Sequence, residues 1–219
     1  MTDVPKVLLA IATYKVVHSL VYQHHMGMVV EMLQSGLLKG LTCKSDMYVT
    51  MARNEFANHA IECASRGEAT HLLMLDDDML LPPKALQSLA RHAAPVVSAA
   101  YYTRDLYPCF YNFDETAGFT WLPSLPGSGT ITCDGSGAGC LLIEIDVLAR
   151  MRAHFGDTFW FDNKHFTEGG VEKYQGEDVH FCRRLKAMGI RCLVDCDVQC
   201  GHVGSGIIDR SIYELGHKP

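Results

Sequence analysis

Three adjacent carboxylates, Asp76–Asp78, directly follow the apolar run Leu72–Leu75. Such a run is typical of a central strand that is covered on both faces. Unpaired carboxylates are costly to bury, so we predict that the strand opens at its carboxyl end into solvent, a cation or a ligand. Alternate residues of an extended segment point the same way, so Asp76 and Asp78 together suit Mg²⁺ or Mn²⁺, with phosphate oxygens completing the coordination. The alternative is an acidic turn that caps a helix, since prolines occupy positions 82 and 83.

Three further groups of residues each have two candidate roles. Glu177 and Asp178 follow Gly176 at the expected start of a helix, where the dipole favours acids, so they are either a cap or a general base. His202 follows a cysteine-lined segment and is either a turn histidine or a neutral third protein ligand to the cation. Arg53 and Asn54, early in another helix, are either solvated or close to a nucleotide, whose phosphate or base edge suits the planar guanidinium.

Phosphate-binding loops of the common kinds are absent from the sequence. Neither a P-loop nor a GxGxxG motif follows the first expected strand, which disfavours P-loop and dinucleotide-binding proteins. The glycine-rich segment 135–139 either lets the backbone approach a ligand closely or forms a plain flexible loop.

Size and composition indicate one compact globular domain. The chain has 219 residues, 48% of them hydrophobic, which is enough to bury a core. Its net charge of −6 means that it has no overall basic surface to attract nucleic acid or anionic membranes. No apolar stretch reaches the roughly 20 residues of a membrane helix, and the amino end does not resemble a signal peptide, so we expect a cytoplasmic protein without membrane insertion. The nine cysteines are then reduced thiols. Seven residues could still form a local basic face: Arg91, His92, Arg104, Arg183, Arg184, Lys186 and Arg191.

The segment 192–200 has an apolar period of two, which indicates a strand with buried thiols. Zinc binding by Cys192, Cys196, Cys200 and His202 is less favoured, because no CxxC pair is present.

Hydrophobic periodicity predicts alternating strands and helices. Strands are expected over 6–12, 44–49, 72–75, 95–100, 140–145 and 192–200, and helices over 19–35, 51–65, 83–92, 147–154 and, after the tripeptide 176–178, to about 188. Asp146 is expected to cap the helix 147–154. The aromatic segment 107–121 reads as β or loop, and 123–139 as a loop or hairpin. The alternation predicts a doubly wound α/β sheet.

The order of these motifs resembles the GT-A glycosyltransferases of the broad family 2 type, including compact phage-type members. The resemblance runs from Lys6 to about Gly204 and rests on the motifs Ala12-Thr13-Tyr14, Ala52-Arg53-Asn54, Asp76-Asp77-Asp78, Gly137-Ala138-Gly139, Trp160-Phe161, Gly176-Glu177-Asp178 and Gly201-His202. It implies a single Rossmann-like GT-A domain with a central, mostly parallel mixed sheet flanked by helices. Within it, 1–100 would be the nucleotide-binding half, 101–204 the acceptor-side half and 205–219 a carboxyl-terminal tail.

The resemblance also implies roles for individual residues. Donor-side positions would be Thr13, Tyr14, Arg53, Asn54, Asp76 and Asp77, with a UDP-sugar favoured as donor. Mn²⁺ or Mg²⁺ would be held by Asp76, Asp78 and His202. Asp178 would be the base of an inverting transfer with Glu177 beside it, although in a retaining enzyme Asp178 would instead hold sugar hydroxyls. Gly139 and Trp160 would border the sugar and the acceptor.

Other functions remain open at this point. The acceptor could be a saccharide, a metabolite, a protein or a hydroxylated base in nucleic acid. A nucleotidyltransferase that makes sugar nucleotides would need a glycine-rich basic loop after the first strand, and residues 12–18 contain no glycine. A non-catalytic nucleotide-sugar binding module is the third option.

Overall fold

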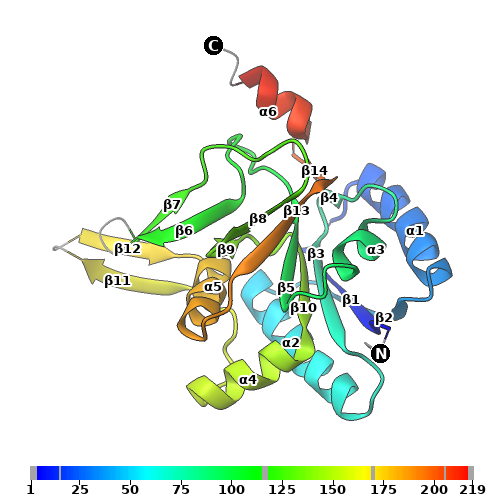
Figure 1. Cartoon of the computed structure of the whole chain (residues 1–219), viewed down its shortest axis with the longest axis horizontal. Coiled ribbons are helices and arrows are strands. Elements are labelled where there is room, and N and C mark those ends of the chain that lie inside the picture. Colours follow the sequence, from blue (N-terminus) through cyan, green and yellow to red (C-terminus); the bar gives the residue numbers. More distant parts are fainter. Residues whose placement is uncertain (1–3, 15, 115–117, 169–170, 205, 217–219) are drawn as a thin grey trace.

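A mixed seven-stranded sheet forms the centre of the molecule (Figure 1). The structure is a computed structural model that describes residues 4–14, 16–114, 118–168, 171–204 and 206–216. The strand order is β2-β1-β3-β10-β5-β13-β8. In chain order these strands are β1 (Val7–Ala12), β2 (Leu38–Lys44), β3 (His71–Asp76), β5 (Val96–Ala100), β8 (Thr130–Cys133), β10 (Cys140–Glu144) and β13 (Cys192–Gln199). β10 and β8 run against the other five, which confirms the predicted α/β class with a mostly parallel mixed sheet.

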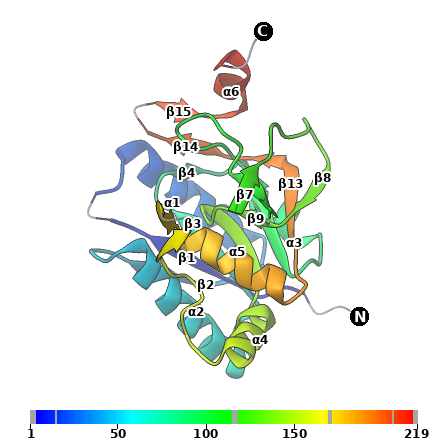
Figure 2. The ribbon, with the colours of Figure 1, turned by 90° about the vertical axis from the view of Figure 1, so that its left-hand side faces the viewer.

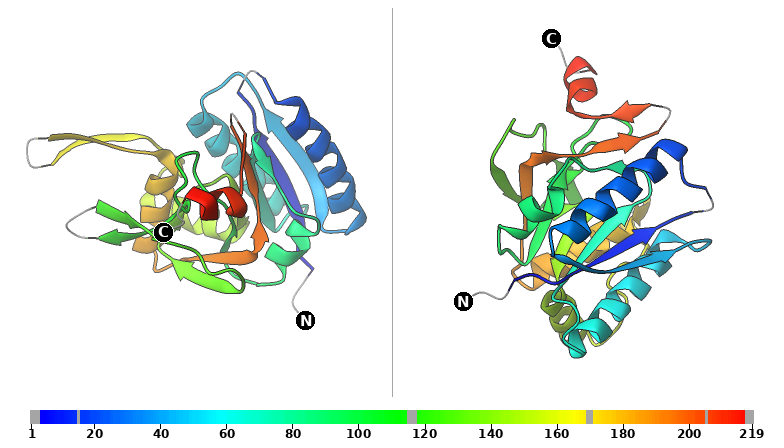
Figure 3. Two further views of the ribbon diagram at one scale, coloured as in Figure 1. Left: turned by 90° about the horizontal axis from the view of Figure 1, so that it is seen from above. Right: turned by 90° about the vertical axis from the view of Figure 1, so that its right-hand side faces the viewer.

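Helices cover both faces of the sheet, because its central strands are apolar on both sides. The helices are α1 (Ser19–Gln34), α2 (Val49–Ser65), α3 (Ala85–Ala90), α4 (Ile145–Phe155), α5 (Glu177–Ala187) and α6 (Arg210–Gly216). Helix α2 packs on β1, β3 and α4, whereas α3 packs on β5 and β13. Helix α1 lies in front of the sheet in the right-hand view of Figure 3.

The strand register brings the candidate residues to one edge. Ala12 at the end of β1 is level with both Lys44 of β2 and Asp76 of β3. The antiparallel β10 begins at that same edge, where the Asp76 amide donates to the Gly139 carbonyl (3.0 Å). Loops that leave the carboxyl ends of the parallel strands therefore meet here, as in other open α/β sheets that bind ligands.

Three smaller sheets surround this edge. β4 (Met79–Leu80), β14 (Gly201–Val203) and β15 (Ile207–Ile208) form one, and β6 (Phe110–Asp114), β7 (Gly118–Trp121) and β9 (Gly135–Ser136) form another. The hairpin of β11 (Lys164–Glu168) and β12 (Val171–Gln175) projects from the body of the molecule and leads into α5 (Figure 1). Helix α5 packs against β9, which Figure 2 shows just above it.

Two predicted elements and one predicted helix cap were wrong in position or extent. The strand expected over 44–49 is β2 (Leu38–Lys44), an edge strand whose alternation is weak because much of it is exposed. Asp146 does not cap α4: the chain passes from β10 straight into the helix, so Glu144 occupies the cap position and Asp146 lies in the first turn. The helix expected over 83–92 is only Ala85–Ala90, and Lys84 precedes it in the left-handed region (φ 62°).

Candidate active site

A cavity of about 270 Å³ opens at the carboxyl edge of β1 and β3. The loop after β1, the start of α2, the acidic turn after β3 and the start of α5 contribute to its wall. Its lining residues are Ala12, Thr13, Tyr14, Met47, Val49, Arg53, Asp76, Asp77, Asp78 and Glu177. Residues predicted from four separate motifs therefore share one cavity.

Arg53 is the buried cation of this site. Its side chain is 5% exposed, one nitrogen contacts both carboxylate oxygens of Asp76 (2.8 and 2.9 Å), and another contacts Glu177 (2.5 Å). Burial by itself would lower the pKa of Arg53, but the surrounding carboxylates raise it above its ordinary value. Arg53 consequently stays charged and joins the end of β3 to the start of α5.

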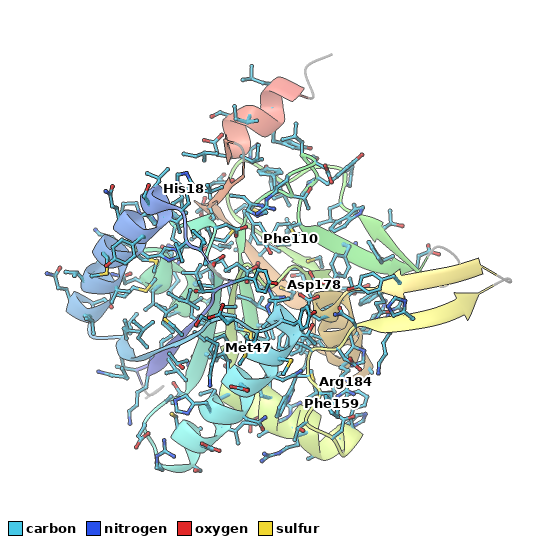
Figure 4. All side chains as sticks on the ribbon, turned by 180° about the vertical axis from the view of Figure 1, so that it is seen from behind. His18, Met47, Phe110, Phe159, Asp178 and Arg184 are labelled. Atoms are coloured by element: carbon cyan, nitrogen blue, oxygen red, sulfur yellow. The ribbon has the colours of Figure 1, made fainter. Side chains whose placement is uncertain are left out.

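Asp178 lies one residue into α5, beside the glycine-rich loop. A Cβ at Gly137 would come within 3.5 Å of its carboxylate, and one at Gly176 within 3.2 Å. Burial, and next the charge of Glu177, raise the pKa of Asp178 to about 6, although Arg53 opposes this. Figure 4 labels this side chain near the centre of the molecule. A carboxyl group with a pKa near neutrality is well suited to proton transfer.

Asp78 and His202 are brought together by backbone pairing. In the sheet of β4 and β14, His202 is level with Met79, and the Val203 amide donates to the Asp78 carbonyl (2.8 Å). His202 Nε2 lies 3.2 Å from Asp78 Oδ2, and Arg104 contacts the same oxygen at 2.6 Å. Burial raises the pKa of Asp78, but the hydrogen bonds and charges of His202 and Arg104 outweigh it, so the net pKa is lowered.

The pair Asp78 and His202 fits a divalent cation, whereas Asp76 does not join them. The Tyr102 carbonyl accepts from His202 Nδ1 (2.9 Å), and Nε2 donates to Asp78. Burial lowers the pKa of His202, but these two hydrogen bonds outweigh it, so the net pKa is raised. A cation between Asp78 and His202 would take the place of the Nε2 proton. Mg²⁺ and Mn²⁺ often take few protein ligands and complete their shell with water and phosphate. Among the described residues, no three His, Cys, Asp or Glu side chains are gathered as a metal site. The expected trio is therefore not assembled, because Asp76 is engaged by Arg53.

Five predicted site residues lie outside the cavity lining: Asp178 and His202, described above, and the three that follow. Both ends of the Asn54 amide bond the backbone of Phe161 (2.7 and 3.0 Å), so Asn54 fixes that segment. Trp160 is 1% exposed and donates to the Leu148 carbonyl, so it is a core residue and offers no surface to an acceptor. Gly139 packs under Tyr101, whose ring a Cβ would approach to 3.2 Å.

Residues that the sequence did not single out also belong to this edge. Met47 and Val49 add apolar surface to the cavity, and the Tyr101 hydroxyl accepts from the Gly139 amide (3.0 Å). Met47 lies just before α2 and Val49 is its first residue, and neither residue type carries a distinctive signal there, so only the fold reveals their place at the cavity.

The basic residues that could have made one face are largely paired within the protein. His92 and Arg91 contact the buried Asp195, and Arg184 forms a bidentate ion pair with Asp157. Lys186 and Arg191 both contact Asp134. The candidate zinc ligands Cys192 and Cys196 on β13, and Cys200 directly after it, are buried free thiols, as the strand interpretation requires.

Comparison with known proteins identifies the fold but no family. No family model matches the chain, and no curated protein matches it. A197 from STIV aligns with a TM-score of 0.59 at 16% identity, over 91% of this chain and 86% of that one. The chain has a GT-A-like fold.

Two glycosyltransferase structures are also similar. GalNAc-T7, solved with UDP, GalNAc and Mn²⁺, aligns with a TM-score of 0.52 at 10% identity, over 93% of this chain and 45% of that one. The catalytic domain of Drosophila β1,4-galactosyltransferase 7, solved with xylobiose, gives 0.50 at 12% identity, over 87% and 65%. At these identities the likeness concerns the fold.

No described helix is both long and apolar enough to cross a membrane.

Proposed function

We propose that this protein is a glycosyltransferase that moves a sugar from a nucleotide-sugar donor to an acceptor hydroxyl. One observation carries the proposal: the loop after β1, Arg53, the acidic turn and Glu177 line a single cavity at the carboxyl edge of the sheet. Glycosyltransferases among the structures of similar fold agree with it, and UDP in one of them makes a UDP-sugar the first donor to test.

The donor is proposed to place its nucleotide against Thr13 and Tyr14 and its diphosphate toward the acidic turn. Asp78 and His202 would hold Mn²⁺ or Mg²⁺ there. A bound divalent cation would offset the charge that develops on the nucleoside diphosphate as it leaves. Arg53 stays with Asp76 and Glu177, so its part is to fix the walls of the cavity rather than to bind phosphate.

Asp178 is the proposed general base. With a pKa of about 6 it is mostly ionised at pH 7, yet it is basic enough to accept the proton of an attacking hydroxyl. Transfer by a single attack on the anomeric carbon inverts its configuration, which requires this carboxylate to face the acceptor side. The acceptor class stays open among saccharides, metabolites, proteins and hydroxylated nucleobases.

The first test is a thermal-shift screen of UDP-, GDP-, CMP- and dTDP-sugars with Mn²⁺, Mg²⁺ or EDTA. A donor at a hundred times its Kd should stabilise the fold by about 2.7 kcal/mol, which for a chain of this size is a shift of about 5–10 °C. Asp78→Asn should lose the metal-dependent shift. Asp146→Asn, which removes a 72% exposed carboxylate on α4, should keep it.

Two results would contradict the proposal. If no donor shifts the wild-type protein with any metal, the cavity does not bind nucleotide sugars. If pyrophosphate is released from a nucleoside triphosphate and a sugar phosphate, the protein is a nucleotidyltransferase instead. Donor hydrolysis or transfer that follows the same metal dependence as the shift would establish an enzyme rather than a binding module.

A further inference from the structure

Arg104 contacts the carboxylate oxygen of Asp78 that a bound cation would use as a ligand. Its guanidinium lies 2.6 Å from Asp78 Oδ2, the same oxygen that His202 approaches, and 60% of the Arg104 side chain is exposed. Asp78 lines the cavity and belongs to the proposed cation site, whereas Arg104 comes from the loop after β5. A guanidinium and a divalent cation cannot both hold this oxygen closely, because they repel each other at such distances.

The loop that carries Arg104 is built to present it. The Thr103 amide donates to the Tyr107 carbonyl, the Tyr107 amide donates to the Thr103 hydroxyl, and Leu106 takes a positive φ of 63°. The stem of Arg104 runs along the backbone of Gly204, where a Cβ would meet it at 3.5 Å. The turn is fixed while the charged end lies at the surface, so the guanidinium can change partner without any change of fold.

Once a cation displaces it from Asp78, Arg104 requires another anion. The diphosphate of the donor is the anion that the proposed function brings to this edge, and the planar fork of arginine matches phosphate oxygens in pairs. We infer that Arg104 is an exchange residue: it pairs with Asp78 in the free protein and with the donor diphosphate in the loaded one. This inference rests on the proposed function.

The exchange has a thermodynamic consequence. In the free protein Arg104 competes with the cation, which weakens metal binding. In the loaded protein the diphosphate holds Arg104 away from Asp78, so donor and metal each strengthen the binding of the other. Removal of Arg104 should therefore change metal affinity and nucleotide affinity in opposite directions. A residue that only stabilised the loop would not have this effect.

The test measures Mn²⁺ binding by the electron paramagnetic resonance of free Mn²⁺, and nucleotide binding by calorimetry with UDP, GDP, ADP and dTDP. In Arg104→Gln, Mn²⁺ affinity without nucleotide should rise about two- to fivefold, the range expected for loss of an exposed ion pair. With Mn²⁺ saturating, affinity for the nucleotide that wild type prefers should fall about tenfold, because a charged hydrogen bond is lost. Arg104→Lys keeps the charge, so it should bind Mn²⁺ like wild type and the nucleotide with intermediate affinity.

Arg66→Gln is the matched control, since Arg66 is also half exposed, pairs with one carboxylate and lies away from this cavity. It should leave both affinities unchanged. Unchanged affinities in Arg104→Gln, or a fall in its Mn²⁺ affinity, would overturn the exchange. In that case nucleotide binding by the wild-type protein would still support the proposed function. If wild type binds Mn²⁺ but none of the four nucleotides, the proposed function fails and the diphosphate half of the inference fails with it.

Discussion

Replacement of the proposed base, Asp178→Asn, should stabilise the protein at neutral pH while it abolishes turnover. The pKa of Asp178 is about 6 in the folded protein, against an ordinary value of 3.8. That difference corresponds to about 3 kcal/mol, at 1.36 kcal/mol for each pKa unit. The folded state therefore prefers the protonated acid, so the ionised carboxylate destabilises it.

The sign of the pH dependence follows from the raised pKa. Below pH 3.8 the acid is protonated in both the folded and unfolded states, and it brings no electrostatic cost. As pH rises from 3.8 through 6, the unfolded chain releases its proton first, and the wild type loses about 3 kcal/mol of stability that the asparagine variant keeps. The free-energy difference between variant and wild type should thus grow by about 2–3 kcal/mol between pH 4 and pH 7.5, and at the upper end this is a rise in Tm of about 6–12 °C.

Urea denaturation of both proteins across this pH range measures the effect. Asp146→Asn provides the control, because it removes an exposed carboxylate and should shift stability by less than about 0.5 kcal/mol at any pH. A difference for Asp178→Asn that stays constant from pH 4 to pH 7.5 would refute the electrostatic account of this site.

Wild-type kcat/KM should fall to about half near pH 6 and to about a tenth near pH 5, as the base is protonated.

Three further results are expected. Arg53→Met should destabilise the protein by about 3 kcal/mol at pH 7 in urea, because Asp76 and Glu177 lose their buried partner; an unchanged midpoint would contradict this. Asn54→Ala should cost about 1–3 kcal/mol by leaving the Phe161 backbone unpaired, and donor affinity in the folded protein should stay as in wild type; a lost affinity would return Asn54 to the donor site. Treatment with EDTA should remove transferase activity and added Mn²⁺ should restore it, whereas activity that survives EDTA would exclude a metal requirement.

The sequence predicted the sheet best where apolar runs were continuous. Strands β1, β3 and β5 are buried on both faces, so their composition alone revealed them. It could not show that β10 enters between β3 and β5 in the opposite direction, because strand direction leaves no mark on a run such as residues 140–144. Edge strand β2 was misplaced for a different reason: three of its seven residues are exposed and only one is buried, so its apolar pattern is weak.

Among site residues, the sequence identified chemistry better than position. Asp76, Asp78 and Glu177 were recognisable because acids beside apolar runs or helix starts must reach water or a partner. The sequence did not show that Asp76 pairs with Arg53 whereas Asp78 pairs with His202. These contacts join residues that lie far apart in the chain. Trp160 shows the reverse case, since an aromatic residue near a motif can equally belong to the core.

The charge balance of the site gives a physical reason to expect a bound metal, and this reason is independent of any resemblance. Five carboxyl groups meet at this edge, from Asp76, Asp77, Asp78, Glu177 and Asp178, and the paired cations are Arg53 and Arg104. The charge of Arg53 is already shared between two of these acids, so it cannot also balance a ligand. A nucleoside diphosphate would add further negative charge to a cavity that already has an excess, and Coulomb repulsion would oppose its entry. A divalent cation at Asp78 would reverse that sign locally and would free Arg104. We therefore expect the metal to enter this cavity before the diphosphate or together with it.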